Sequence, residues 1–158
     1  MIVVSDTSPI NYLILTGYID LLKTLYHRVI IPRSVFTELN SEAAPAKVQA
    51  FIKDLPGWIE VRQAKALPPL PLDPGEREAI GLAEEFRADL LLLDESKARD
   101  IARGRGLAVT GTLGILERAA EQGFVDLPEA IDRLKKTNFR LAVTLFEEAL
   151  KRNPTKKG

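Results

Sequence analysis

Cysteine is absent from this sequence of 158 residues, and histidine occurs once, as His27. A disulfide scaffold, a zinc–thiolate site, an iron–sulfur cluster and a thiol nucleophile are therefore excluded. The single histidine also rules out a metal site built from several histidines. The chemistry of any site in this chain must rest mainly on carboxylates and hydroxyls.

The chain also lacks an excess of charge of either sign, because 22 Lys and Arg residues balance 22 Asp and Glu residues. Its longest apolar run, Leu90 to Leu93, is far shorter than the ~20 residues that span a bilayer. The first residues carry no basic segment of the signal-peptide type. We therefore expect a cytoplasmic protein with no membrane partner. The composition, 46% hydrophobic and 28% charged, is that of an ordinary globular domain.

Short apolar runs alternate with amphipathic segments along the chain. Strands are predicted near residues 2–4, 28–31, 58–61, 90–93 and 107–110. Helices are predicted near 10–15 and 19–26, from Pro32 through Leu39, and near 46–55, 73–87, 95–104, 113–122, 128–136 and 141–152. This alternation predicts an α/β domain with a central, mostly parallel sheet of five strands.

The proline-rich stretch over residues 67–72 cannot be helical. It need not separate two domains, because each half of the chain is too short for its own core. We predict one domain over residues 1–152, with its core in about 1–125 and its C-terminal helices in 128–152. Residues 153–158 are expected to form a frayed tail.

Four carboxylates occupy positions where an open parallel sheet binds ligands, beyond the carboxyl ends of its strands. Asp6 follows the first predicted strand and Asp94 the fourth. Glu38 lies in the helix after the second strand, and Glu76 in the first turn of the helix after the proline-rich stretch. Oxygen ligands without His or Cys suit Mg²⁺ or Mn²⁺. Because such an ion activates water and stabilises phosphoryl displacement, the pattern indicates a metal-dependent nuclease.

Each acid also has an ordinary structural interpretation. Asp6 could cap the helix that follows it, and Asp73 and Glu76 have the spacing of a capping box. Glu38 could be an exposed helix acid, and Asp94 could cap the next helix. The joint placement of the acids, rather than any one of them, favours a shared site.

Four segments of the chain resemble the PIN (PilT N-terminus) domain family, in particular its prokaryotic single-domain branch related to VapC-type toxins. They are Val3-Val4-Ser5-Asp6-Thr7-Ser8-Pro9, Val35-Phe36-Thr37-Glu38-Leu39, Leu72-Asp73-Pro74-Gly75-Glu76-Arg77-Glu78-Ala79-Ile80 and Leu91-Leu92-Leu93-Asp94-Glu95. The resemblance covers roughly residues 1–125. It implies a three-layer α/β/α sandwich with sheet order 3-2-1-4-5 and ribonuclease activity that depends on Mg²⁺ or Mn²⁺. It also implies frequent homodimers and often an antitoxin partner.

Carried over by motif, Asp6, Glu38, Glu76 and Asp94 occupy the acidic-quartet positions of the family. Three departures concern the neighbouring polar residues and the third acid. Ser8 stands where many PIN nucleases have Asn, and it can still donate a hydrogen bond. Glu76 stands where the family often has Asp. Around the fourth acid, Leu92 and Ser96 replace a common Thr and a second Asp, which leaves the number of metal ions open.

Two polar groups beyond the quartet remain candidates for binding. Thr110 and Thr112 follow the fifth strand and could either form a polar wall of the site or cap the next helix. Four basic residues follow Asp94 and could hold RNA phosphates or form a solvated helix face: Lys97, Arg99, Arg103 and Arg105.

The leading hypothesis is that the protein is a metal-dependent endoribonuclease. The role of toxin in a toxin–antitoxin pair is one function that the resemblance implies for it. The alternative is a PIN-fold module with weak or no catalysis that binds RNA or a protein partner.

Overall fold

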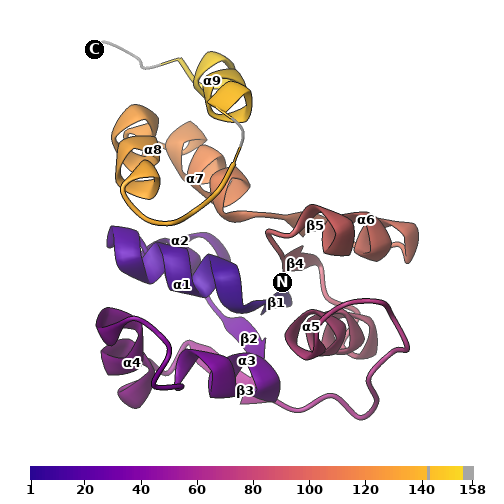
Figure 1. Ribbon diagram of the computed structural model, residues 1–158. Helices are drawn as coiled ribbons and strands as arrows, with labels where there is room; N and C mark the ends of the chain where they lie inside the picture. The colour runs from indigo at the N-terminus through magenta and orange to yellow at the C-terminus, as the bar shows by residue number, and fades with distance from the viewer. Residues whose placement is uncertain (142, 155–158) are drawn as a thin grey trace.

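The computed structural model describes residues 1–141 and 143–154 and has three layers, helices–sheet–helices (Figure 1). All strands of the sheet are parallel. They are β1 (Val3–Ser5), β2 (Val29–Pro32), β3 (Ile59–Arg62), β4 (Leu90–Leu92) and β5 (Val109–Thr110). Their order is β3-β2-β1-β4-β5. The predicted α/β/α fold and sheet order are therefore confirmed.

The central strand β1 is the point where the strand order reverses. Val4 of β1 pairs with Ile30 of β2 on one side and with Leu91 of β4 on the other. Val3 packs into the core on one face of the sheet, whereas Val4 and Leu91 pack into the core on the opposite face. Because both faces are covered by helices, these strands are apolar almost throughout.

Helices cover the sheet from both sides. One face is covered by α5 (Pro74–Glu85) and α6 (Ser96–Gly104), which enclose a core that includes Ala79, Ile80 and Leu93. The other face carries α1 (Thr7–Thr16), α2 (Asp20–Tyr26), α4 (Ala46–Lys53) and α7 (Thr112–Glu121). The short α3 (Arg33–Leu39) contacts both α1 and α5 and so joins the two helical layers.

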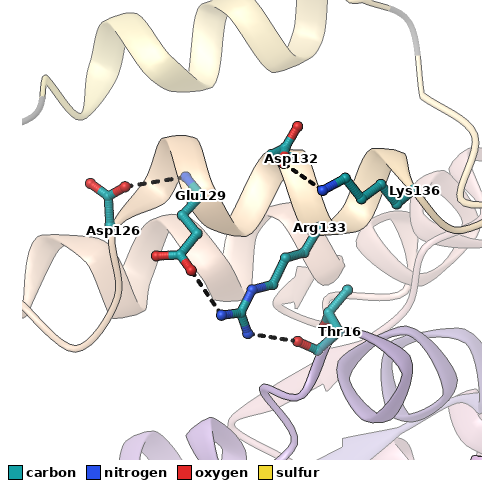
Figure 2. A network of polar contacts seen from close by, with 6 residues as sticks. All are labelled: Thr16, Asp126, Glu129, Asp132, Arg133 and Lys136. Carbon is teal, nitrogen blue, oxygen red and sulfur yellow. Dashed lines mark hydrogen bonds and ion pairs between the residues drawn. The ribbon is translucent and has the colours of Figure 1, made fainter.

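The C-terminal helices α8 (Leu127–Lys135) and α9 (Val143–Arg152) lie over α7 and α1 rather than on the sheet (Figure 1). Figure 2 shows Arg133 of α8 reaching the end of α1, where it donates to the Thr16 carbonyl oxygen at 3.2 Å. The same guanidinium donates to Glu129 at 2.8 Å and lies 4.9 Å from the centre of the Tyr18 ring. Because the carbonyl end of a helix is electronegative, this cation stabilises α1 as well as fixing α8 to it.

A left-handed glycine ends α1 just beyond that contact. Gly17 has φ 81° and donates its N–H to Ile14, while the Tyr18 N–H bonds to the Leu13 carbonyl at 2.8 Å. These paired bonds are the Schellman motif, which an L side chain at the glycine position would strain. The helix predicted near 10–15 thus extends over Thr7–Thr16 and ends at Gly17.

The remaining segments connect or extend these elements. The proline-rich stretch over 67–72 is non-helical, as predicted. Asn153, which the sequence assigns to the tail, donates to Glu117 at 3.2 Å, and residues 155–158 lie outside the described residues. Within the part of the chain that the structure describes, no helix is both long enough and apolar enough to cross a membrane.

Candidate active site

Three elements bring acidic side chains to the carboxyl end of β1. Asp6 directly follows β1 and is fixed there by its backbone N–H, which donates to the Leu92 carbonyl of β4 at 2.9 Å. Glu38 lies in the last turn of α3, and Asp73 and Glu76 lie at the start of α5. The site is therefore at the switch point of the sheet, where this class of fold binds ligands.

The acids gather around Gly75. A methyl group on its α-carbon would lie 3.4 Å from Asp6 Oδ1, 3.6 Å from Asp73 Oδ1 and 3.7 Å from Glu38 Oε2. Carboxylate oxygens from three elements thus surround one point above the first turn of α5. Glycine keeps this point open, since any larger residue would place its side chain among the oxygens.

Burial and mutual repulsion act on these carboxyls together. Asp6 is only 7% exposed, and its burial, with Asp73, Glu76 and Glu38 nearby, raises its pKa to about 8. Asp6 occupies the N-cap position of α1 but makes no side-chain capping hydrogen bond there. The nearby Thr7 N–H lowers the pKa of Asp6, but by less than burial raises it. Burial also raises the pKa of Glu76, and the charges of Asp73 and Glu95 add to the effect. Ionising these carboxyls together is therefore unfavourable, and a bound cation would relieve this cost.

Asp73 is the member of this cluster that sequence reasoning took only as a helix cap. It does cap α5, because Asp73 Oδ1 accepts from the Glu76 N–H at 2.8 Å, while Glu76 Oε1 accepts from the Asp73 N–H at 3.3 Å. The capping box also aims the Asp73 carboxylate at Gly75 and Asp6. The sequence signal for Asp73 was its position three residues before the predicted ligand Glu76. Because this spacing also predicts a capping box, Asp73 was interpreted as a cap alone.

Asp94 is held apart from these acids by the start of α7. Its Oδ1 accepts from the Thr112 N–H at 2.6 Å, and its Oδ2 accepts from the Thr112 hydroxyl at 2.7 Å. Burial raises the pKa of Asp94, whereas the Thr112 bonds and the charge of Arg99 lower it in part. Of the predicted quartet, the structure thus groups Asp6 and Glu38 around Gly75 with Glu76 adjacent, and it places Asp94 on Thr112.

Two predicted capping roles are corrected by these contacts. Asp94 does not cap α6, because the Glu95 side chain accepts from the Ala98 N–H at 2.8 Å. Thr112 does not cap α7 with its side chain either, since Gly111 is at the N-cap position and the Thr112 hydroxyl bonds to Asp94. The reason is the strand register: Leu92 pairs with Thr110, so Asp94 and Thr112 follow at the same level.

Two side chains leave little space at position 111. A methyl group there would come within 2.7 Å of Asp94 Oδ1 and 2.9 Å of Arg99 Nη1. Thr110, the other predicted polar residue, directs its hydroxyl towards Gly114. Thr112 is thus the residue of this pair that contacts a quartet acid.

A polar cavity of about 300 Å³ adjoins Glu38. One face of α1 lines it with Thr7, Ser8, Asn11 and Tyr12, and Thr7 donates its hydroxyl to Glu38 Oε2 at 2.8 Å. Ser8, a supporting polar residue in the prediction, lines this cavity together with Glu38. Asn11 and Tyr12 were not predicted, although polar residues spaced four apart on an apolar helix mark one face of that helix.

A buried acid outside the cluster ties two of its elements together. Glu78 of α5 is 6% exposed, and its Oε1 accepts from the Ser34 N–H at 2.9 Å and from the Ser34 hydroxyl at 2.7 Å. Its Oε2 accepts from the Ala64 N–H at 3.2 Å. Because Pro32 at the N-cap of α3 offers no capping side chain, Glu78 satisfies this helix end from α5. The contact positions the helix that carries Glu38.

The predicted basic residues have different surroundings. Arg105 is bound to Glu84 of α5 at 2.8 Å, and Arg103 forms an exposed pair with Asp100 at 3.6 Å. Arg99 is half-buried beside Asp94, and Lys97 is exposed. The four residues therefore do not form one uniform basic strip.

The acid cluster fits a divalent cation by its chemistry. All of its donors are carboxylate oxygens, which Mg²⁺ and Mn²⁺ prefer, and their repulsion is the electrostatic condition that a cation relieves. Among residues 1–141 and 143–154, no three acidic or histidine side chains are placed closely enough to chelate an ion. The oxygens around Gly75 stand 3.4–3.7 Å from their common point, wider than the ~2.1 Å of a Mg²⁺ shell.

A larger cavity of about 690 Å³ lies elsewhere, between the α7–α8 connection and the end of α9. Phe124, Val125 and Pro154 contribute to its lining, and it includes none of the clustered acids. Size alone therefore does not identify the site. The acids at the switch point do, since burial and neighbouring carboxylates together raise the pKa of Asp6 there.

The fold and the site define an α/β/α protein with an acidic site at the switch point of a parallel sheet. A family model described as "DUF3368: PIN domain" matches residues 2–154. The chain therefore belongs to the PIN domain family, whose members are generally nucleases.

A solved structure agrees with this assignment. The chain is similar to a PilT N-terminus domain protein from the hyperthermophilic archaeon Sulfolobus solfataricus P2, with a TM-score of 0.56. The two are 20% identical, and the match covers 75% of this chain and 93% of that one. At this identity the likeness shows the shared fold alone. No curated protein matches the sequence.

Proposed function

We propose that this protein is an endoribonuclease that depends on Mg²⁺ or Mn²⁺. The observation that carries the proposal is the convergence of Asp6, Glu38 and Asp73 around Gly75, where burial raises the pKa of Asp6 to about 8. Burying carboxylates that repel one another reduces folding stability, and groups with pKa values perturbed in this way cluster at functional sites. A hard divalent cation is the ligand that their chemistry favours.

The residues of the chain have separable roles in this proposal. Asp6, Glu38, Glu76 and Asp94, together with Asp73, would hold the cation. When bound, the cation lowers the pKa of water and stabilises the charge that develops on a phosphodiester. Thr7 orients Glu38, and Thr112 orients Asp94 through two hydrogen bonds. Each bonded carboxylate oxygen retains a further lone pair for a ligand.

Cleavage of RNA by purified protein tests the proposal. Structured and unstructured RNAs are incubated with wild type and Asp6→Asn in Mn²⁺ or Mg²⁺, with EDTA as the metal-free arm. Asp54→Asn is the matched control, because Asp54 is exposed and lines neither the acid cluster nor its adjoining cavity. We expect cleavage by wild type and Asp54→Asn only, and only with metal. Equal cleavage by Asp6→Asn would refute the proposed role of the cluster.

A PIN module that binds without cutting is the second candidate. The wide spacing of the acids, and the bonding of both Asp94 oxygens to Thr112, favour it. In that case wild type would retain RNA or a protein partner on a column but would release no cleavage products in Mn²⁺.

The toxin role and the homodimer are further proposals that rest on the family resemblance. A small antitoxin encoded by a neighbouring gene, which suppresses the growth defect caused by expressing this chain, would support the toxin role. Light scattering of the purified protein measures its oligomeric state, and a monomer at working concentrations would contradict the homodimer.

A further inference from the structure

A third cavity, of about 330 Å³, is lined by Asp94, which does not line the polar cavity of α1. Four arginines line it, and they come from segments far apart in the chain. Arg99 and Arg103 belong to α6, Arg140 follows α8, and Arg152 ends α9. We call this space the arginine cavity.

The charges in the arginine cavity are only partly compensated. Arg152 pairs with Glu117 at 2.8 Å, and Arg103 forms its exposed pair with Asp100. Among the described residues, Arg140 forms no ion pair. Asp94 is the acid that faces Arg99, and its two oxygens already accept from Thr112. The cavity therefore keeps a positive excess beside an acidic site.

One donor atom of Arg99, a residue that lines this cavity, lacks an acceptor among the described residues. The Nε atom of Arg99 is buried and has no hydrogen-bond partner among the described residues. Buried donors of this kind are rare in proteins because each lost hydrogen bond is costly. Guanidinium groups match the oxygens of a phosphate in shape and charge, and they bind it through paired hydrogen bonds.

We infer that the arginine cavity binds a backbone phosphate of the RNA next to the one that is cleaved, an inference that rests on the proposed nuclease function. Asp94, the fourth acid of the predicted quartet, lines the cavity, so this phosphate would lie beside that carboxylate. Phe139 in the cavity wall gives a neighbouring nucleoside an apolar surface. Arg140 and Arg152 are then part of the substrate site, and α9 is not only a cover for the other helices.

Binding of a fluorescein-labelled octauridylate, measured by anisotropy in EDTA, tests this role without cleavage. Arg140→Ala removes one arginine that is exposed and has no ion pair among the described residues, so the fold should survive, as circular dichroism would verify. Lys151→Ala is the control, because Lys151 is an exposed cation of α9 outside the cavity. Arg140→Lys keeps the charge but not the paired hydrogen bonds.

We expect Arg140→Ala to weaken binding roughly tenfold and to reduce the slope of log affinity against log salt by about 0.7. Arg140→Lys should keep most of the slope, and Lys151→Ala should match wild type. Equal effects of Arg140→Ala and Lys151→Ala, or no binding by wild type, would overturn the inference. If wild type binds in this pattern but does not cleave RNA in Mn²⁺, only the nuclease proposal fails.

Discussion

Replacing Gly75 by alanine should separate the stability of this protein from its affinity for a divalent cation. The new methyl group would lie 3.4–3.7 Å from oxygens of Asp6, Asp73 and Glu38, which is ordinary van der Waals contact. No backbone needs to move to accept it. The methyl group would nevertheless fill the point that the three carboxylates surround.

The expected magnitudes follow from the position of Gly75 in the first turn of α5. Alanine is better than glycine inside a helix by up to ~1 kcal/mol, which corresponds to a Tm increase of roughly 2–4 °C at this chain length. An ion present at 100 times its Kd stabilises the wild type by about 2.7 kcal/mol, or roughly 5–10 °C. We expect Gly75→Ala to lose this second gain.

Thermal unfolding with EDTA and with millimolar Mn²⁺ measures both effects in one experiment. Gly104→Ala is the matched control, because Gly104 also lies in a helix and a methyl group there meets nothing within 4 Å. Gly104→Ala should keep the Mn²⁺ shift of wild type. The same Mn²⁺ shift in Gly75→Ala as in wild type would show that the three oxygens do not enclose the cation site.

Three further predictions concern single contacts. The pKa of Asp6 is raised from 3.8 to about 8 in the folded state. Metal-free wild type should therefore lose stability as pH rises from about 4 to about 8, by up to ~1.4 kcal/mol per pH unit. Urea unfolding in EDTA should show Asp6→Asn becoming more stable relative to wild type over this pH range, and parallel stability curves would contradict the prediction. Glu78→Gln should cost about 2 kcal/mol, because its amide group would face a backbone N–H. Glu85→Gln on the exposed side of α5 should cost under ~0.5 kcal/mol, because the Gln oxygen can still accept from the Lys65 N–H that binds Glu85; equal losses in urea would show that Glu78 does not bind α3 to α5. Arg133→Ala should cost about 1–2 kcal/mol through Thr16 and Tyr18, and Lys136→Ala, which breaks an exposed pair with Asp132, should fall within ~0.5 kcal/mol by the same assay.

The elements and the location of the site could be predicted because local signals agree with the fold. Apolar runs mark buried parallel strands, Gly17 marks the end of α1, and Pro32 marks the start of α3. An acid directly after a strand, such as Asp6, lies at the ligand-binding edge by the geometry of parallel sheets alone. These inferences need no knowledge of which side chains meet.

The partners of the acids could not be predicted, because they depend on register and on contacts between distant segments. Asp94 meets Thr112 only because Leu92 pairs with Thr110 in the sheet. Asp73 faces Asp6 only because α5 packs against β1. Arg140 enters the arginine cavity from a segment that follows α8 and lies outside every motif of the sequence. Each of these contacts joins parts of the chain that no local pattern relates.

The acid cluster requires attraction elsewhere, because its members repel one another from separate elements. Asp6 ends β1, Glu38 ends α3 and Asp73 begins α5, so their repulsion tends to separate these elements. Glu78 opposes this by binding Ser34, at the start of α3, to α5 through two hydrogen bonds, and a third holds Ala64 beyond β3. Arg133 fixes the far end of α1, the helix that begins directly after Asp6, to α8. Contacts that look purely structural thus hold the carboxylates near one another in the absence of a cation. They therefore limit how far the carboxylates must move when a cation binds.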